Sequence, residues 1–227
     1  MGPCCRLWRD PWWTETALDG SRLDRLSPLS GTAFLVLVIA GNALQGSTPA
    51  LHGDADAVAD FYGDKATSIA VGMSLSLVSL FFLAWFLGSL RQTLLAGEER
   101  DGPLTAVATA GGVAALALMA GGFALNAAGA LRAQESGSIP AGVAVTFYDG
   151  GLALSGLAAP LAMAILLAAT SAVVLRSRAL PRWFGLSSAA LAVLGLITPL
   201  SFILFFVFPL WTTAAGILLY RQSSRTS

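Results

Sequence analysis

The sequence predicts an all-α, polytopic transmembrane helical bundle, because its long apolar stretches need lipid as their surroundings. The chain has 227 residues, of which 56% are hydrophobic and only 11% are charged, and its mean hydropathy is +0.72. An ordinary soluble domain has about 25% charged residues. A soluble fold of this composition would lack the polar groups to cover its surface, so we expect the apolar runs to lie in a membrane.

The first four apolar runs each predict one helical span. A helix rises ~1.5 Å per residue, so ~20 residues cross the ~30 Å hydrocarbon core of a bilayer. Arginines end three of the runs, at Arg91, Arg132 and Arg176. The predicted spans are 29–45, 68–90, 104–131 and 151–175.

The last apolar run, 183–220, is too long for one ordinary span. It contains Pro199 and Pro209, and proline removes a backbone donor and disfavours helix at the preceding residue. We therefore predict two spans, 183–198 and 200–220, joined by a tight turn near Pro199. The alternative is one kinked span with a re-entrant piece.

The basic residues support six crossings. If the chain crosses six times, eleven Lys and Arg residues lie on the side of both termini and only Lys65 and Arg132 lie on the other side. Cytoplasmic segments are the ones enriched in basic residues, so both termini are predicted to be cytoplasmic. The chain is then divided into a cytoplasmic tail (1–27), a six-helix transmembrane domain (28–221) and a short cytoplasmic tail (222–227).

The termini, cysteines and net charge exclude several classes of protein. Residues 1–25 mix basic and acidic side chains without a clear cleavage pattern, so the first apolar run is predicted to be a retained helix. Cys4 and Cys5 are adjacent and make no disulfide framework; they are either free or acylated thiols. With His52 as the only histidine there is no zinc spacing. No metal or cofactor is predicted, and a net charge of zero argues against nucleic-acid binding.

Polar residues within or beside the predicted spans are few. The spans contain no ionisable residue away from their ends, which argues against a proton-driven transporter. The candidates for ligand binding in a shallow outward cavity are Asn42, Gln45, Asn126 and Tyr148. The alternative is that the amide side chains only hydrogen-bond neighbouring helices, an interaction worth about 0.6 to 2 kcal/mol.

The segment between the first two spans is the strongest candidate for chemistry. Clustered carboxylates and a histidine can bind a hard cation or supply acid and base groups, although the spacing matches no EF-hand or zincin motif. If the segment is helical, Asp56 and Asp60 share one face. The alternative is a solvated loop that is acidic because basic residues are excluded from the outer side. The candidate residues are His52, Asp54, Asp56, Asp60, Tyr62, Asp64 and, from the third loop, Asp149.

Several short motifs resemble a known group of proteins. They are 60–64 (Asp-Phe-Tyr-Gly-Asp), 79–91, 180–183 (Leu-Pro-Arg-Trp) and 208–211 (Phe-Pro-Leu-Trp). Together they are similar to a family of small actinobacterial integral membrane proteins of unknown function. The resemblance covers roughly residues 29–221. It implies a six-span fold in a bacterial inner (plasma) membrane and carries over no activity or catalytic residue.

Three functional hypotheses follow from the sequence. The first is a non-enzymatic membrane protein that binds a small apolar ligand or a membrane partner, including a second copy of itself, with lipids around it. The second is a membrane-embedded enzyme with acid/base or metal residues at the outer face. The third is a facilitator or exporter of a neutral solute, for which a polar path past Asn42, Asn126 and residues 74–79 is needed.

Overall fold

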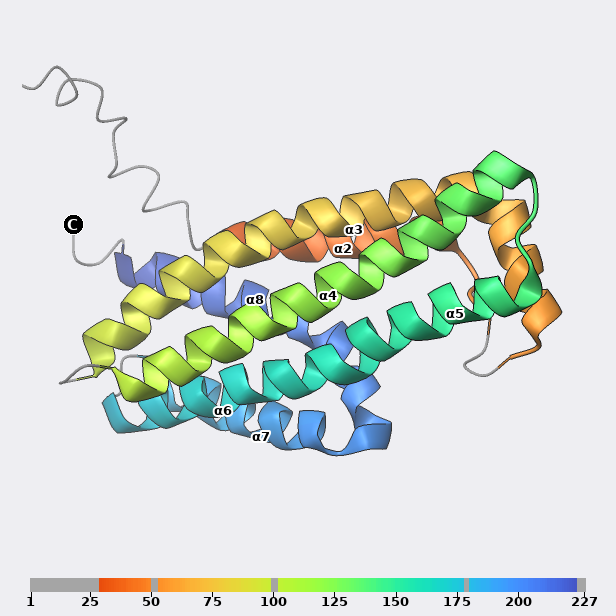
Figure 1. Ribbon diagram of the computed structural model, residues 1–227. Coiled ribbons are helices and arrows are strands. Elements are labelled where there is room, and N and C mark those ends of the chain that lie inside the picture. The colour runs from red at the N-terminus through yellow and green to blue at the C-terminus, as the bar shows by residue number, and fades with distance from the viewer. Residues whose placement is uncertain (1–28, 50–52, 99–101, 178–179, 224–227) are drawn as a thin grey trace, which may run out of the picture.

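The computed structural model is a bundle of helices that run back and forth along one long axis (Figure 1). It describes residues 29–49, 53–98, 102–177 and 180–223. All regular structure in these residues is helical, which confirms the predicted all-α class. The elements are α2 (Ser30–Gln45), α3 (Ala55–Gly97), α4 (Pro103–Ser136), α5 (Ala141–Leu152), the π-helical segment η3 (Ala153–Ala158), α6 (Ala159–Ser177), α7 (Arg182–Leu196) and α8 (Thr198–Ser223).

Four of these helical stretches are long and apolar enough to cross a membrane. They are Ala55–Gly97, Pro103–Ser136, Ala141–Ser177 and Ser201–Arg221, and two further apolar helices, Ser30–Gln45 and Arg182–Leu196, are shorter. The structure therefore has the character of a membrane protein. The number of crossings and the side on which the termini lie remain predictions.

The helices extend beyond the predicted spans at several ends. The second predicted span begins at residue 68, whereas α3 begins at Ala55. Likewise α4 continues to Ser136, where Gly137 (φ 71°) ends it in the left-handed region. The apolar run marks only the part of a helix that suits hydrocarbon, so polar residues can continue the same helix beyond it. The apolar runs thus located the helices and underestimated their length.

The predicted turn near Pro199 lies slightly earlier in the chain. The backbone leaves helical geometry at Ile197 (φ −89°, ψ 101°), and α8 begins at Thr198, so Pro199 belongs to the first turn of a helix. The first-turn N–H groups of a helix have no intrahelical acceptor, so proline is tolerated there. Proline thus marks the start of α8 and does not form the turn itself.

Small residues bring the helices into close contact. A Cβ atom placed on Gly122 of α4 would lie 2.6 Å from the carbonyl oxygen of Gly151 and 2.7 Å from the Cβ of Ser155. One placed on Gly111 would lie 2.7 Å from the backbone nitrogen of Leu166 in α6. Small residues are what let helix backbones approach in a membrane. These glycines therefore position α4 against both halves of the α5–α6 helix.

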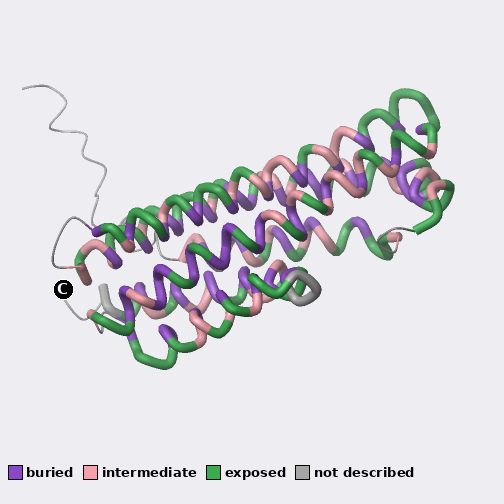
Figure 2. Tube along the Cα trace, turned by 60° about the horizontal axis from the view of Figure 1, so that its bottom comes forward, coloured by how far each residue is buried: buried purple, intermediate pink, exposed green. Residues whose placement is uncertain are grey.

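An aromatic cluster fills the bundle between α3, α7 and α8. Trp211 stacks on Phe184 at 5.4 Å and on Phe208 at 5.7 Å, and it meets the edge of Phe86 at 6.2 Å. The indole N–H of Trp211 donates to the Ser188 hydroxyl at 2.9 Å, which satisfies the buried donor. Figure 2 shows that buried positions along the helices face the neighbouring helices. The core is thus largely apolar, and among the described residues the Thr170 hydroxyl is a buried polar group without a hydrogen-bond partner.

The α3–α4 connection is closed by one carboxylate. Glu98 accepts hydrogen bonds from the backbone N–H groups of Leu104 (3.2 Å) and Thr105 (2.9 Å) and from the Thr105 hydroxyl. These groups are at the N-terminus of α4, where the N–H groups need external acceptors. The Thr105 side-chain hydrogen bond is the main reason that the pKa of Glu98 lies below its usual value.

Candidate functional site

The candidate chemistry-bearing segment forms a short helix across one end of the bundle. Asp54 begins it, because its carboxylate accepts a hydrogen bond from the Asp56 N–H at 3.4 Å. The backbone leaves helical geometry at Lys65 (φ −119°, ψ 16°), where α3 turns into its long portion. We call residues 55–64 the cap helix. Figure 1 shows it in orange, turned across the end of the bundle that also holds the α4–α5 connection, which we call the cap end.

The cap helix is amphipathic, with its acidic residues on the outside. Val58, Phe61 and Tyr62 are buried in the hydrophobic core, and they recur at the spacing of one helix face. The carboxylates Asp54, Asp56, Asp60 and Asp64 are all exposed. The structure therefore separates Tyr62 from the carboxylates with which it was grouped: the tyrosine points into the bundle and the aspartates point to the surface.

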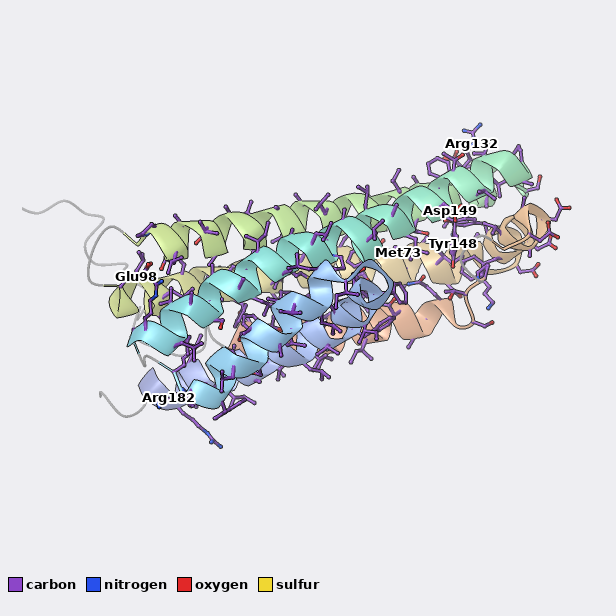
Figure 3. The ribbon with its side chains drawn as sticks, turned by 90° about the horizontal axis from the view of Figure 1, so that it is seen from below. Met73, Glu98, Arg132, Tyr148, Asp149 and Arg182 are labelled. Atoms are coloured by element: carbon purple, nitrogen blue, oxygen red, sulfur yellow. The ribbon has the colours of Figure 1, made fainter. Side chains whose placement is uncertain are left out.

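The two remaining acid/base candidates do not complete a cluster with the cap helix. Asp149 lies half-buried on α5 at the cap end, and Figure 3 shows it beside Tyr148. His52 lies outside the described residues. Within the part of the chain that the structure describes, no three His, Cys, Asp or Glu side chains are close enough to hold a metal ion. The described carboxylates thus form an acidic surface without a coordinating centre.

Tyr62 and Asn126 make the main polar contact inside the cap end. The Tyr62 hydroxyl donates to the Asn126 Oδ1 at 2.9 Å, and the Asn126 amide donates to the Gly122 carbonyl at 3.1 Å. Both side chains are buried, with Tyr62 0% and Asn126 7% exposed. Gly129 leaves room for the tyrosine ring, because a Cβ there would lie 3.0 Å from its Cζ. The contact joins the cap helix to α4.

Tyr148 and Lys65 attach the α2–α3 connection to the same region. The Tyr148 hydroxyl donates to the Pro49 carbonyl at 2.7 Å, and its ring meets the edge of Phe61 at 6.1 Å. The Lys65 ammonium donates to the carbonyl and the hydroxyl of Ser47, each at 3.2 Å, and lies 5.5 Å from the centre of the Phe61 ring. Phe61 is thus held between a tyrosine and a cation.

Asn42 and Gln45 bond mainly within their own helix. The Asn42 amide donates to the Val38 carbonyl at 2.8 Å. The buried Gln45 amide donates to the Gly41 carbonyl at 3.3 Å and reaches the Met73 sulfur at 3.9 Å. Of the four candidate ligand-binding residues, Asn42 thus bonds within its own helix, Gln45 also contacts Met73 of α3, and Asn126 and Tyr148 bond to partners across the cap end.

The serines of α3 do not line a common path. Ser74 is exposed, and its hydroxyl donates to the Ala70 carbonyl at 2.8 Å. Ser76 and Ser79 are buried, and each donates to a carbonyl of α3 itself, at 3.0 Å and 2.6 Å. Hydroxyl groups that bond their own helix are ordinary features of transmembrane helices. The geometry therefore gives the facilitator hypothesis no support.

Contacts to Ser47 and Pro49 were missed by the sequence reasoning. Tyr148 donates to the backbone carbonyl of Pro49, and Lys65 donates to that of Ser47. Every residue carries such a carbonyl. No residue type marks them in advance. In contrast, the spacing of Val58, Phe61 and Tyr62 beside four aspartates could have indicated an amphipathic helix.

Comparisons with models of protein families, with curated proteins and with solved structures gave no match. Membership of the actinobacterial membrane-protein group therefore stays a prediction. The described residues and their contacts are the basis for any assignment of function.

Proposed function

We propose that this chain is an integral membrane protein that crosses a bacterial inner membrane six times and acts by binding a membrane partner. The ends of the bundle support this topology. Among the described residues, the basic residues of the cap end are Lys65 and Arg132, whereas the helix ends at the opposite end carry Arg176, Arg221 and Arg182, the last of which Figure 3 labels there. Basic residues are concentrated on the cytoplasmic side of membrane proteins, so the opposite end and both termini are assigned to the cytoplasm.

The observation that carries the binding function is the exposed side of α4. The exposed positions between Ala106 and Ala124 are alanines and two valines, whereas the glycines of this helix pack inward. Small side chains let a second helix approach closely, so that dispersion forces and interhelical packing can hold it. The exposed positions, which we call the alanine face, are Ala106, Val107, Ala110, Val113, Ala114, Ala117 and Ala124.

The neighbouring helices present a different surface. Phe81 and Trp85 are exposed on α3, and Leu161 and Ile165 are exposed on α6. Large apolar side chains extend into the lipid and fill the space beside the helix. An alanine surface leaves that space open, so that another helix can approach closely. A partner helix therefore fits the alanine face better than the surfaces beside it.

The interior of the bundle supports a binding role over catalysis. The carboxylates of the cap helix are exposed and separate, and Tyr62 and Asn126 use their polar groups on each other. Large side chains such as Phe86, Phe184 and Phe208 fill the interior. A small apolar ligand enclosed in the bundle would have to displace these side chains. A membrane partner is therefore favoured over a small apolar ligand.

Photo-crosslinking in the intact membrane tests the binding function. A photoreactive residue is introduced at Ala114 in the alanine face, and at Phe81 as the matched lipid-facing control. We expect Ala114 to give a discrete protein adduct and Phe81 to give lipid adducts. An adduct of twice the chain mass would identify a second copy as the partner, and lipid adducts at both positions would contradict the proposal.

A reporter fusion tests the topology separately. A reporter placed after Gln222 should be active in the cytoplasm, whereas one placed in the α4–α5 connection at Gly137 should be active outside. Periplasmic activity after Gln222 would overturn the six-crossing count and leave the membrane assignment standing.

A further inference from the structure

The two helices of the α7–α8 hairpin differ in length: α8 has 26 residues and is long enough to cross a membrane, whereas α7 is much shorter than α3 and α4. α7 has 15 residues, so it extends about 22 Å, less than the roughly 30 Å of a bilayer core. Only Ile197 separates it from α8. Figure 1 shows the turn ending part of the way along the bundle, while α3, α4 and α5 continue toward the cap end.

Contacts with the α5–α6 helix fix the level of this turn. A Cβ on Gly195 would lie 3.0 Å from the Cβ of Ala164 and 3.1 Å from the carbonyl oxygen of Pro160. Just after the turn, the Phe202 ring packs on Gly156, at 3.2 Å from the corresponding position. The turn therefore lies beside the η3 segment and the start of α6.

Apolar helix continues beyond the level of the turn toward the cap end. The first charged residue in that direction on α5 is Asp149, seven positions before Gly156, or about 10 Å farther out. On α4, Gly122 lies at the level of Gly151 and Ser155, and the next charged residue, Arg132, is ten positions later, or about 15 Å. Both helices place the turn well inside the uncharged zone.

Exposed apolar side chains occupy this same zone on other helices. Leu44 near the end of α2 is 48% exposed and Leu131 near the end of α4 is 52% exposed. Large exposed apolar residues so close to the cap end mark lipid contact under the proposed membrane assignment. The hydrocarbon boundary therefore lies beyond the α7–α8 turn.

The described side chains on both sides of the turn, at positions 193–197 and 201–206, have the chemistry of a lipid-facing surface. The α2–α3 and α4–α5 connections at the cap end expose Ser47, Thr48 and Ser138, as segments in water do. In contrast, every exposed side chain among the described positions 193–197 and 201–206 is apolar. These residues are Val193, Leu196, Ile197, Phe202, Ile203 and Phe206.

The backbone of Ile197 is also suited to an apolar environment. Unpaired backbone groups are expensive in hydrocarbon. The Ile197 N–H donates to the Leu194 carbonyl at 3.3 Å, and the Ile197 carbonyl accepts from the Ser201 N–H at 2.9 Å. The single residue between the two helices thus has both of its backbone groups bonded.

We infer that the α7–α8 turn ends inside the outer leaflet and is covered there by lipid acyl chains. Acyl chains fit this surface better than a partner helix does, because the tip exposes large aliphatic and aromatic side chains instead of small ones. The inference rests on the proposed membrane assignment with both termini in the cytoplasm. It makes the last two of the six proposed crossings a re-entrant hairpin, which enters from the cytoplasmic side, stops short of the outer surface and is covered there by lipid of the outer leaflet.

Thiol labelling and fluorescence quenching test this inference in the full chain. Cys4 and Cys5 are first replaced by serine, and Leu196→Cys, which alters a 63% exposed side chain, carries the probe. Gly142→Cys in the cap end is the water-exposed control, since a Cβ there meets nothing within 4 Å. Ile165→Cys, 48% exposed in the middle of α6, is the membrane control.

The expected result is slow labelling together with strong quenching. A thiol must ionise to react, and hydrocarbon disfavours the thiolate, so a membrane-impermeant maleimide should label Leu196→Cys at least about tenfold more slowly than Gly142→Cys. A bimane probe at Leu196→Cys, in phosphatidylcholine vesicles with nitroxides along the acyl chains, should be quenched more by these nitroxides than by a headgroup nitroxide.

Each other outcome overturns a different statement. Labelling of Leu196→Cys as fast as Gly142→Cys would place the turn in water and overturn the inference. Slow labelling without quenching would mean that protein, instead of lipid, covers the tip. If Ile165→Cys were also unquenched and fully reactive, the membrane-spanning assignment itself would fail. A second variant, Val193→Cys, repeats the measurement one turn earlier in α7.

Discussion

Replacing Tyr62 by phenylalanine removes one hydroxyl group from the interior of the cap end and leaves the ring in place. The hydroxyl donates to Asn126 Oδ1 at 2.9 Å, and the asparagine keeps its second bond, from its amide to the Gly122 carbonyl. The substitution therefore leaves one buried acceptor without a partner. It tests whether the cap helix is held to α4 by this contact.

The expected loss follows from the burial of both groups. Hydrogen bonds between transmembrane helices are worth on average about 0.6 and at most about 1.7 kcal/mol, and an unpaired buried acceptor costs about 1 to 3 kcal/mol. Because Tyr62 is completely buried, we expect Tyr62→Phe to destabilise the protein by about 1 to 2 kcal/mol. Thr146→Val, at an exposed hydroxyl that bonds its own helix, should cost less than about 0.5 kcal/mol.

A double-mutant cycle with Asn126→Ala isolates the pair. Reversible unfolding in mixed detergent micelles gives the free energies of the two single variants and the double variant. The coupling between Tyr62 and Asn126 should be about 1 kcal/mol. A coupling of zero within error, with both single variants folded, would refute the conclusion that this bond joins the cap helix to α4.

The remaining predictions concern packing, a buried donor and one carboxylate. In the same unfolding assay, Gly122→Ala should lower the free energy of unfolding by more than about 2 kcal/mol, because its Cβ would meet backbone atoms. The control Gly88→Ala, where a Cβ meets open space, should leave the stability unchanged or raise it by up to about 1 kcal/mol. Equal effects of the two substitutions would contradict the close packing of Gly122. Ser188→Ala should cost about 1 to 3 kcal/mol, because the Trp211 N–H loses its acceptor, and an unchanged unfolding free energy would show that this bond contributes nothing. The folded-state pKa of Glu98 is lowered, so the stability that it contributes is complete above its ordinary value of 4.5 and is lost as the pH falls below that value; Glu98→Gln should flatten the acid limb of the stability profile, and an unaltered limb would exclude this carboxylate as its source.

The helices were largely predictable because the requirement for lipid acts on composition. A stretch such as 104–131 needs no knowledge of its neighbours to be recognised as a membrane helix. The inward-facing glycines of α4 could be anticipated for the same reason, since small residues mark close approach. The helix ends were less predictable, because polar residues such as those of the cap helix continue α3 without adding apolar length.

The candidate site was predictable as a set of residues and not as an arrangement. Its aspartates and Tyr62 adjoin in sequence, yet the kink at Lys65 and the amphipathic pattern send them to opposite faces of one helix. The partner of Tyr62 is 64 residues away and that of Tyr148 is 99 residues away. Contacts over such distances depend on how the helices pack, which a single sequence does not specify.

The cap helix has a consequence for how the chain is assembled during synthesis. It emerges with the first helical hairpin, but its anchors, Asn126 and Tyr148, belong to segments made much later. Until α4 and α5 are in place, the apolar side of the cap helix has no helix to pack against. The ribosome must therefore synthesise about two-thirds of the chain before this end of the molecule can close.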